Sequence, residues 1–244
     1  MRVMAMEESI ALVLGRIKSA ALAAGRNPEE ITLVAVSKTA PVQSVERAFC
    51  AGLAVFGENR IQEAGEKMQA LKAGPARWHF IGHLQTNKAR AALKLGFELI
   101  HSVDSERLFF ELEKQAALLN IEAQDVLVEI KLSHEPSKHG LMPEELFGLL
   151  EKSRGAKHIN IVGLMTMPPW SEDSGAARPY FRKLRELRDE ARRRGFSGIG
   201  ALSMGMSGDF EVAIAEGATL VRVGEAIFGA RKNEKEPEAL KGNG

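Results

Sequence analysis

Short apolar runs recur along the chain and alternate with longer segments in which apolar residues return every three or four positions. The eight short runs, which we predict to be strands, are Thr32–Ser37, Leu53–Phe56, Arg77–Ile81, Glu98–Val103, Val126–Ile130, Ile159–Met165, Ile199–Leu202 and Thr219–Val223. The helix-type segments between them include Val42–Ala51, Ile61–Lys72, Glu106–Leu119, Pro143–Ser153, Ala177–Arg194 and Phe210–Glu216. Helical spacing around Ile10–Ile17 predicts a further helix ahead of the first run.

This regular alternation indicates a parallel α/β sheet. Eight strand–helix units in 244 residues suit a (β/α)8 TIM barrel in a single domain, which is our prediction. A doubly wound open sheet has the same local pattern and is the alternative. We expect the barrel to occupy residues 1–231 and the polar segment 232–244 to form a flexible tail.

Composition narrows the range of partners. Lys and Arg number 33 against 32 Asp and Glu, so there is no electrostatic case for nucleic acid or an acidic membrane. No apolar run reaches membrane-spanning length and the N-terminus lacks a signal-peptide pattern, so we expect a cytoplasmic protein. The single cysteine, Cys50, excludes an internal disulfide and is predicted to be a small buried hydrophobic residue.

In a barrel of this kind the chemistry lies at the carboxyl ends of the strands. The first apolar run leads to Lys38, which shares the alternation of Val34 and Val36. Lys38 therefore points into the barrel mouth if those valines face inward. Partial desolvation there favours a neutral, nucleophilic amine. A solvated lysine at a strand end is the alternative, and for an isolated lysine the commoner one.

Two glycine-bearing turns follow the last two runs, within the segment Leu202–Gly229. The first turn holds Ser203, Gly205 and Ser207, and the second begins at Gly224. Glycine lets the backbone approach an anion closely, and a helix start offers free N–H groups, so the turns predict a phosphate site. Ser207 is also predicted to be the N-cap of the next helix. An ordinary β–α turn is the alternative.

Charged residues flank these turns. Arg222 shares the alternation of Leu220 and Gly224 and so faces inward. There it either forms an ion pair with a barrel carboxylate or, if the bound ligand contains a pyridine ring, donates a hydrogen bond to the ring nitrogen. Because arginine stays protonated, that pyridine nitrogen would stay unprotonated, which weakens the ring as an electron sink. Asp209 and Glu211 suit a helix N-terminus but would repel phosphate if they turned inward.

A strand-end lysine and a phosphate cradle together suggest pyridoxal 5′-phosphate (PLP) held as a Schiff base on Lys38. His79, His83 and His101 show no metal-binding spacing, so no metal site is predicted. Met165, at the end of the sixth run, is either core or part of an apolar pocket for the ring.

The chain resembles the pyridoxal-phosphate homeostasis protein family from about Ile31 to Gly229. The matching segments are VAVSKT (34–39), FGEN (56–59), WHFIG (78–82), LQTNK (84–88), HSVDS (101–105), GLM (163–165), LSMGMSGD (202–209) and VRVGEAIFG (221–229). The resemblance implies a fold type III PLP-binding barrel, similar to the N-terminal domain of bacterial alanine racemases. It implies that Lys38 is the Schiff-base lysine and that Arg222 lies at the pyridine nitrogen. The residues that it places around the phosphate are Ser203, Gly205, Ser207 and Gly224. Those that it places near the cofactor are Asn59, His79 and Met165.

Some positions depart from the family pattern. Arg60 stands where tyrosine is common, Lys131 where an asparagine often follows the fifth strand, and Ala40 where a second lysine is frequent. These departures affect the pocket rim rather than cofactor binding. Lys138, in a loop after the fifth run, is predicted to be a solvated lysine.

The resemblance implies a carrier that binds PLP, limits the free aldehyde and releases it to apo-enzymes, without robust catalysis. We expect it to be a monomer. An amino-acid racemase is the alternative, but it needs a second acid or base opposite the lysine. Alanine racemases take a tyrosine from an additional β domain, whereas the one tyrosine here, Tyr180, falls in a helical segment. A Schiff-base aldolase that uses Lys38 without a cofactor is a further alternative.

Overall fold

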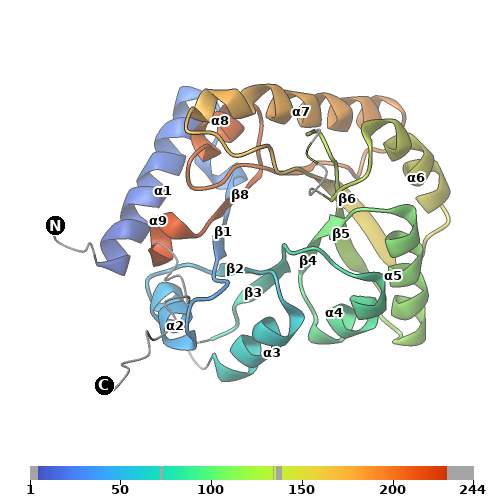
Figure 1. Ribbon diagram of the computed structural model, residues 1–244, viewed down its shortest axis with the longest axis horizontal. Coiled ribbons are helices and arrows are strands. Elements are labelled where there is room, and N and C mark those ends of the chain that lie inside the picture. Colours follow the sequence, from blue (N-terminus) through green and yellow to red (C-terminus); the bar gives the residue numbers. More distant parts are fainter. Residues whose placement is uncertain (1–4, 72–73, 134, 136–138, 230–244) are drawn as a thin grey trace, which may run out of the picture.

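The computed structural model describes residues 5–71, 74–133, 135 and 139–229. Within them eight parallel strands follow one another in chain order and close into a barrel (Figure 1). The strands are β1 (Thr32–Val36), β2 (Val55–Glu58), β3 (Arg77–Phe80), β4 (Leu99–Val103), β5 (Gln124–Glu129), β6 (Ile159–Met165), β7 (Ala201–Ser203) and β8 (Leu220–Val223). The predicted (β/α)8 barrel is confirmed, and the open-sheet alternative is wrong because β8 pairs with β1.

Helices surround the strands on the outside of the ring. They are α1 (Met6–Ala23), α2 (Val42–Cys50), α3 (Ile61–Ala70), α4 (Ala89–Leu95), α5 (Glu106–Leu118), α6 (Leu146–Ser153), α7 (Arg178–Arg193), α8 (Phe210–Ala215) and α9 (Glu225–Phe228). Short 3-10 turns occupy Pro28–Glu30, Thr86–Lys88, Pro143–Glu145 and Ser174–Ala177. Helix α1 lies beside α8 and α9, so the N-terminal helix covers the point where the barrel closes (Figure 1).

The barrel has two hydrophobic cores, one on each face of its sheet, because successive side chains of a strand point to opposite faces. Inside the barrel lies a small cluster made of Val34, Val55, Leu99, Leu127, Met165 and Leu220. The larger core lies between the strands and the helices. Val34 faces inward and pairs in register with Arg222, so Arg222 faces the barrel interior as predicted, and the condition stated for an inward-pointing Lys38 is met at Val34.

Two further observations bear on the composition. Cys50 is exposed, so the prediction of a buried cysteine is wrong. Helix α2 buries Val45 and Ala48, and Cys50 lies about 140° around the helix from Val45, off that buried stripe. None of the described helices is long and apolar enough to cross a membrane.

Candidate functional site

The carboxyl ends of β7, β8 and β1 lie next to one another and carry most of the predicted site. Lys38 is half-buried in the turn directly after β1. Gly224 directly follows β8, and a Cβ atom built on it would lie 3.2 Å from the carbonyl oxygen of Val36. The second glycine loop therefore lies against the end of β1, two residues before Lys38.

Backbone contacts hold the glycine loop after β7. Gly205 has φ +94°, and a Cβ atom there would lie 2.6 Å from Cβ of Ala213 and 2.9 Å from Cα of Phe210. Its carbonyl oxygen accepts a hydrogen bond of 3.0 Å from the backbone N–H of Arg222. The loop is thus pressed onto α8 and bonded to β8, and position 205 requires glycine.

The start of α8 differs from the prediction. The N-cap is Asp209 and not Ser207, because the chain turns at residues 207–209 before helical bonding begins. The Asp209 carboxylate points back and accepts a hydrogen bond of 2.6 Å from the N–H of Met206. Burial raises the pKa of Asp209, although this bond opposes the effect. Helices α8 and α9 are each shorter than two turns, so an anion here would rely on loop N–H groups more than on helix dipoles.

A chain of polar side chains runs through the barrel interior. Arg222 Nη1 donates to Ser203 Oγ at 2.5 Å, and Ser203 Oγ lies 2.8 Å from His101 Nδ1. His101 Nε2 in turn lies 3.0 Å from His79 Nδ1. Because a guanidinium only donates, Ser203 Oγ accepts from Arg222, and in one consistent arrangement Ser203 then donates to His101 and His101 donates to His79. In that arrangement His79 Nε2 carries the last N–H; this nitrogen lies 4.0 Å from Glu98 Oε1 and has no hydrogen-bond partner among the described residues.

Burial shifts the pKa values of the two histidines and the arginine in this row of polar side chains. It lowers the pKa of His79 to about 4, helped by the positive charge of Arg77. It lowers the pKa of His101 well below its usual value, so both imidazoles are neutral at pH 7. Burial also lowers the pKa of Arg222 to about 10, which still leaves a buried cation near neutral pH.

Arg222 has no ion pair among the described residues. Its Nη2 donates to the carbonyl oxygen of Thr166 at 3.0 Å, so the hydrogen bonds to Thr166 and Ser203 both go to neutral acceptors. The direct ion pair that the sequence left open is therefore not found there. The carboxylates of Glu129 and Asp209 act on Arg222 only through space. The N–H groups of the guanidinium that are not bonded to Ser203 or Thr166 are available to a ligand.

Glu129 is an interior acid that the sequence analysis missed. It shares the inward alternation of Leu127 and is 4% exposed. Burial raises its pKa to about 7, with the charge of Asp104 adding to the effect and that of Arg222 opposing it. The signal was a lone carboxylate inside the apolar run VLVEI, which is costly to bury.

A buried network of charges fixes the residue before Lys38. Lys67 on α3 donates 2.7 Å hydrogen bonds to the carbonyl oxygen of Ser37 and to Glu58 Oε1 and Glu63 Oε1. The Ser37 hydroxyl also donates to Glu58 Oε1, at 2.7 Å. Burial raises the pKa of Glu58 although Lys67 and Ser37 oppose the shift.

The same network fixes the residue after Lys38. Thr39 has φ +65°, a left-handed conformation that is unfavourable for a β-branched side chain. Its N–H donates to Glu63 Oε1 at 2.7 Å, which holds this conformation in place. Both neighbours of Lys38 are therefore bonded to the α3 network. From sequence, Glu63 and Lys67 resemble an ordinary surface pair one helical turn apart.

The remaining predicted residues occupy different depths. Asn59 and Ser207 are half-buried in the segments after β2 and β7. Met165 is 1% exposed and belongs to the interior cluster. His79 lies inside the barrel and is connected to Ser203 only through His101. Lys138 lies outside the described residues. At the rim, Arg60 is exposed and Ala40 and Lys131 are half-buried.

Comparison with known proteins places this barrel in a class. Residues 17–232 match the family described as alanine racemase, N-terminal domain. An alanine racemase from Clostridium difficile shares the fold at a TM-score of 0.69 and 16% identity, covering 93% of this chain and 57% of that one.

More similar proteins define the family. A pyridoxal phosphate homeostasis protein of Aquifex aeolicus is 47% identical over 225 residues, which cover 92% of this chain and 98% of that protein. The structure of PipY from Synechococcus elongatus with PLP bound superposes with a TM-score of 0.81 at 34% identity, covering 92% of this chain and 100% of PipY. The chain belongs to the pyridoxal phosphate homeostasis protein family.

Proposed function

We propose that this protein binds PLP reversibly through a Schiff base on Lys38 and supplies it to apo-enzymes, and that it does not turn over amino acids efficiently. The observation that carries the proposal is that the Gly224 loop lies against the end of β1, two residues before Lys38, beside the buried cation Arg222. The names of the relatives and the PLP bound to PipY support the choice of ligand.

The residues at the mouth fit the parts of this cofactor. When bound, PLP supplies an aldehyde that a primary amine captures as a Schiff base. Lys38 would provide that amine, and Arg222 would donate to the pyridine nitrogen. The loops at Gly205 and Gly224 would hold the phosphate with backbone N–H groups, helped by the Ser207 hydroxyl. Asn59, Met165, Ser203 and His79 would line or support the ring.

The same residues argue against efficient racemisation. Since burial leaves the pKa of Arg222 at about 10, the guanidinium stays protonated and would keep the pyridine nitrogen unprotonated. Such a ring stabilises a carbanion poorly. The chain's one tyrosine, Tyr180, lies on α7 outside the ring of strands. Glu129 is the interior group whose pKa of about 7 would suit it to move a proton, so it is the residue to test if racemisation occurs.

A spectroscopic titration tests cofactor binding. Adding PLP to the full chain should produce the absorbance of a Schiff base, and Lys38→Ala should abolish it. Lys18→Ala, at an exposed position on α1, is the matched control and should leave the spectrum unchanged. Retention of the full band by Lys38→Ala would overturn the proposal. The absence of any PLP band, together with trapping of a carbonyl substrate on Lys38, would favour the aldolase.

Isotope exchange tests the absence of catalysis. PLP-loaded protein is incubated with L-alanine in deuterium oxide, followed by chiral analysis and measurement of α-deuterium. Our proposal expects little or no inversion. Inversion at about 1 per second or faster would restore the racemase, and its loss in Glu129→Gln would identify the second proton carrier.

A further inference from the structure

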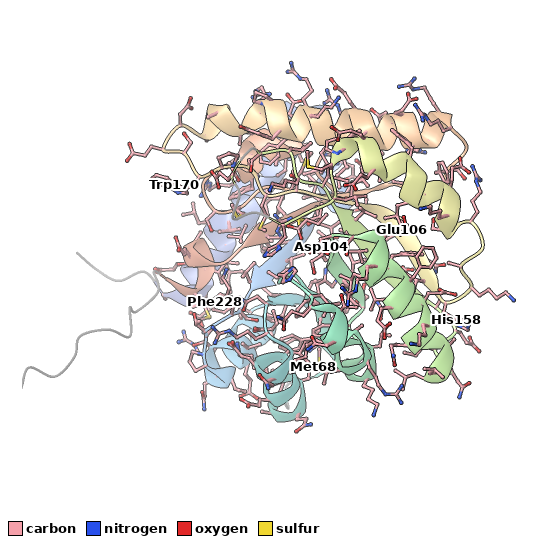
Figure 2. All side chains as sticks on the ribbon, turned by 45° about the vertical axis from the view of Figure 1, so that its right-hand side comes forward. Met68, Asp104, Glu106, His158, Trp170 and Phe228 are labelled. Atoms are coloured by element: carbon pink, nitrogen blue, oxygen red, sulfur yellow. The ribbon has the colours of Figure 1, made fainter. Side chains whose placement is uncertain are left out.

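Three loops bring together His83, Asp104 and His139 on the other side of the barrel mouth. The loops follow β3, β4 and β5, and β4 stands opposite β8 in the ring of eight strands. One ring nitrogen of each histidine and one carboxylate oxygen of Asp104 all lie within 4.8 Å of one another. Figure 2 labels Asp104, where the chain leaves β4 for α5. None of these three residues is among those proposed to hold PLP.

We propose that this cluster binds one divalent transition-metal ion of the zinc type. Two imidazole nitrogens and one carboxylate oxygen are ligands that Zn²⁺, Co²⁺ and Ni²⁺ prefer, whereas Ca²⁺ and Mg²⁺ favour all-oxygen sites. The inference goes beyond the proposed function, because none of the three residues is needed there. Sequence spacing indicated no metal site since the ligands come from three separate loops.

The distances suit a shared ion. Ligand atoms that each lie about 2.0–2.2 Å from one zinc ion are about 3–3.5 Å apart. His83 Nδ1 and Asp104 Oδ2 are 3.0 Å apart, which already has this spacing. The imidazoles of His83 and His139 stack with centroids 3.8 Å apart and planes inclined by 14°. Both histidines are exposed, so their rings can turn about the Cβ–Cγ bond and bring the nitrogens closer.

The first two ligands stand beside anchored residues. Leu84, next to His83, is 2% exposed and fixes that segment in the core. Ser105, next to Asp104, caps α5 by accepting a hydrogen bond from the N–H of Leu108 at 3.3 Å. The backbone positions of both ligands are therefore set by the fold before any ion binds.

The third ligand is held by the return of its loop to β5. Leu141 donates its N–H to Glu129 O at 2.8 Å, and Lys131 donates its N–H to Leu141 O at 2.9 Å. Gly140, between His139 and Leu141 in the sequence, has φ +129°, and a Cβ atom there would lie 2.6 Å from the backbone nitrogen of Lys131. Glycine at this position lets the loop press against β5 and present His139 at the mouth.

The coordination would be incomplete from protein ligands alone. Three protein ligands leave at least one position for water or a small ligand, as in sites that exchange their ligands. The exposure of His83, 39% for its side chain, gives an ion direct access from solvent. Without metal, the contact between His83 and Asp104 is a simple hydrogen bond or ion pair.

Metal binding to chelator-treated, full-length protein tests the proposal. Titration with ZnCl2, followed by calorimetry, should show one bound ion per chain. His83→Ala and His139→Ala should each weaken binding by at least about tenfold, and Asp104→Asn should weaken it as well. The control is His158→Ala. His158 lies directly before β6, at the opposite end of the barrel from the mouth, and Figure 2 labels it.

Replacing zinc with Co²⁺ gives a second readout that is independent of any activity. Visible absorption bands of a low-coordinate cobalt site should appear in the wild-type protein and in His158→Ala, and be lost in His83→Ala. Circular dichroism establishes that each variant is folded. Failure of the wild type to bind Zn²⁺, or equal binding by wild type and the double variant His83→Ala/His139→Ala, would overturn the proposal.

Discussion

The two sides of the proposed PLP site are built in different ways. The turn that carries Lys38 is fixed by buried charged side chains, with Lys67 bonded to Ser37, Glu58 and Glu63. The loop after β7 is fixed by a glycine with no room for a side chain and by backbone bonds to β8. A reactive amine needs a defined direction, which side-chain bonds can give. An anion needs several N–H donors at close range, which the exposed backbone of a glycine loop can supply.

The largest effect is expected at the charged side. Lys67→Met removes the cation that compensates two carboxylates, one of them fully buried, and should destabilise the protein by about 3–5 kcal/mol. Urea unfolding measures this. The matched control is Lys152→Met, which breaks an exposed pair with Glu106 and should cost about 1 kcal/mol or less. Equal losses in the two variants would show that the network does not fix the Lys38 turn.

A second effect concerns Glu129 and depends on pH. Its pKa is about 7 in the folded protein against 4.5 ordinarily, so folding favours the protonated form. The penalty for burying this group is absent below pH 4.5, grows as the pH rises, and is complete above pH 7. Glu129→Gln removes the penalty. The stability of the variant relative to wild type should therefore rise by on the order of 3 kcal/mol between these limits.

Urea unfolding of both proteins at several pH values measures this difference. Comparing the two proteins largely cancels the opposite contribution of His79 and His101, whose pKa values are lowered by burial and which titrate in both. A stability difference that stays flat between pH 4.5 and 7 would show that Glu129 does not take up its proton in this range.

A substitution in the loop after β7 should change the relative affinity for PLP and pyridoxal more than the stability of the protein. Gly205→Val places a side chain against Ala213 and Phe210 and shifts the loop. Affinity for PLP should fall by at least about tenfold, or about 1.4 kcal/mol, while affinity for pyridoxal, which lacks the phosphate, should change little. Fluorescence or absorbance titration with both ligands measures this. Equal losses for the two ligands would mean that the loop does not hold the phosphate.

The sequence predicts those features that depend on local pattern. Alternating apolar runs predict the barrel. The positions of Lys38 and Gly224 at strand ends predict that both lie at the same end of the barrel. Contacts between distant segments are not predictable in this way. The sequence pattern predicts a surface lysine at position 67, but the packing of α3 places Lys67 over the end of β1, where it is buried. The N-cap at Asp209 depends on the turn after Gly205, and the His83–Asp104–His139 cluster depends on three loops meeting.

Chemical trapping of the cofactor tests whether PLP forms its Schiff base with Lys38. PLP-loaded protein is reduced with borohydride, digested and mapped by mass spectrometry. We expect the phosphopyridoxyl group on the peptide that contains Lys38. Modification of a different lysine, with Lys38 left unmodified, would contradict it.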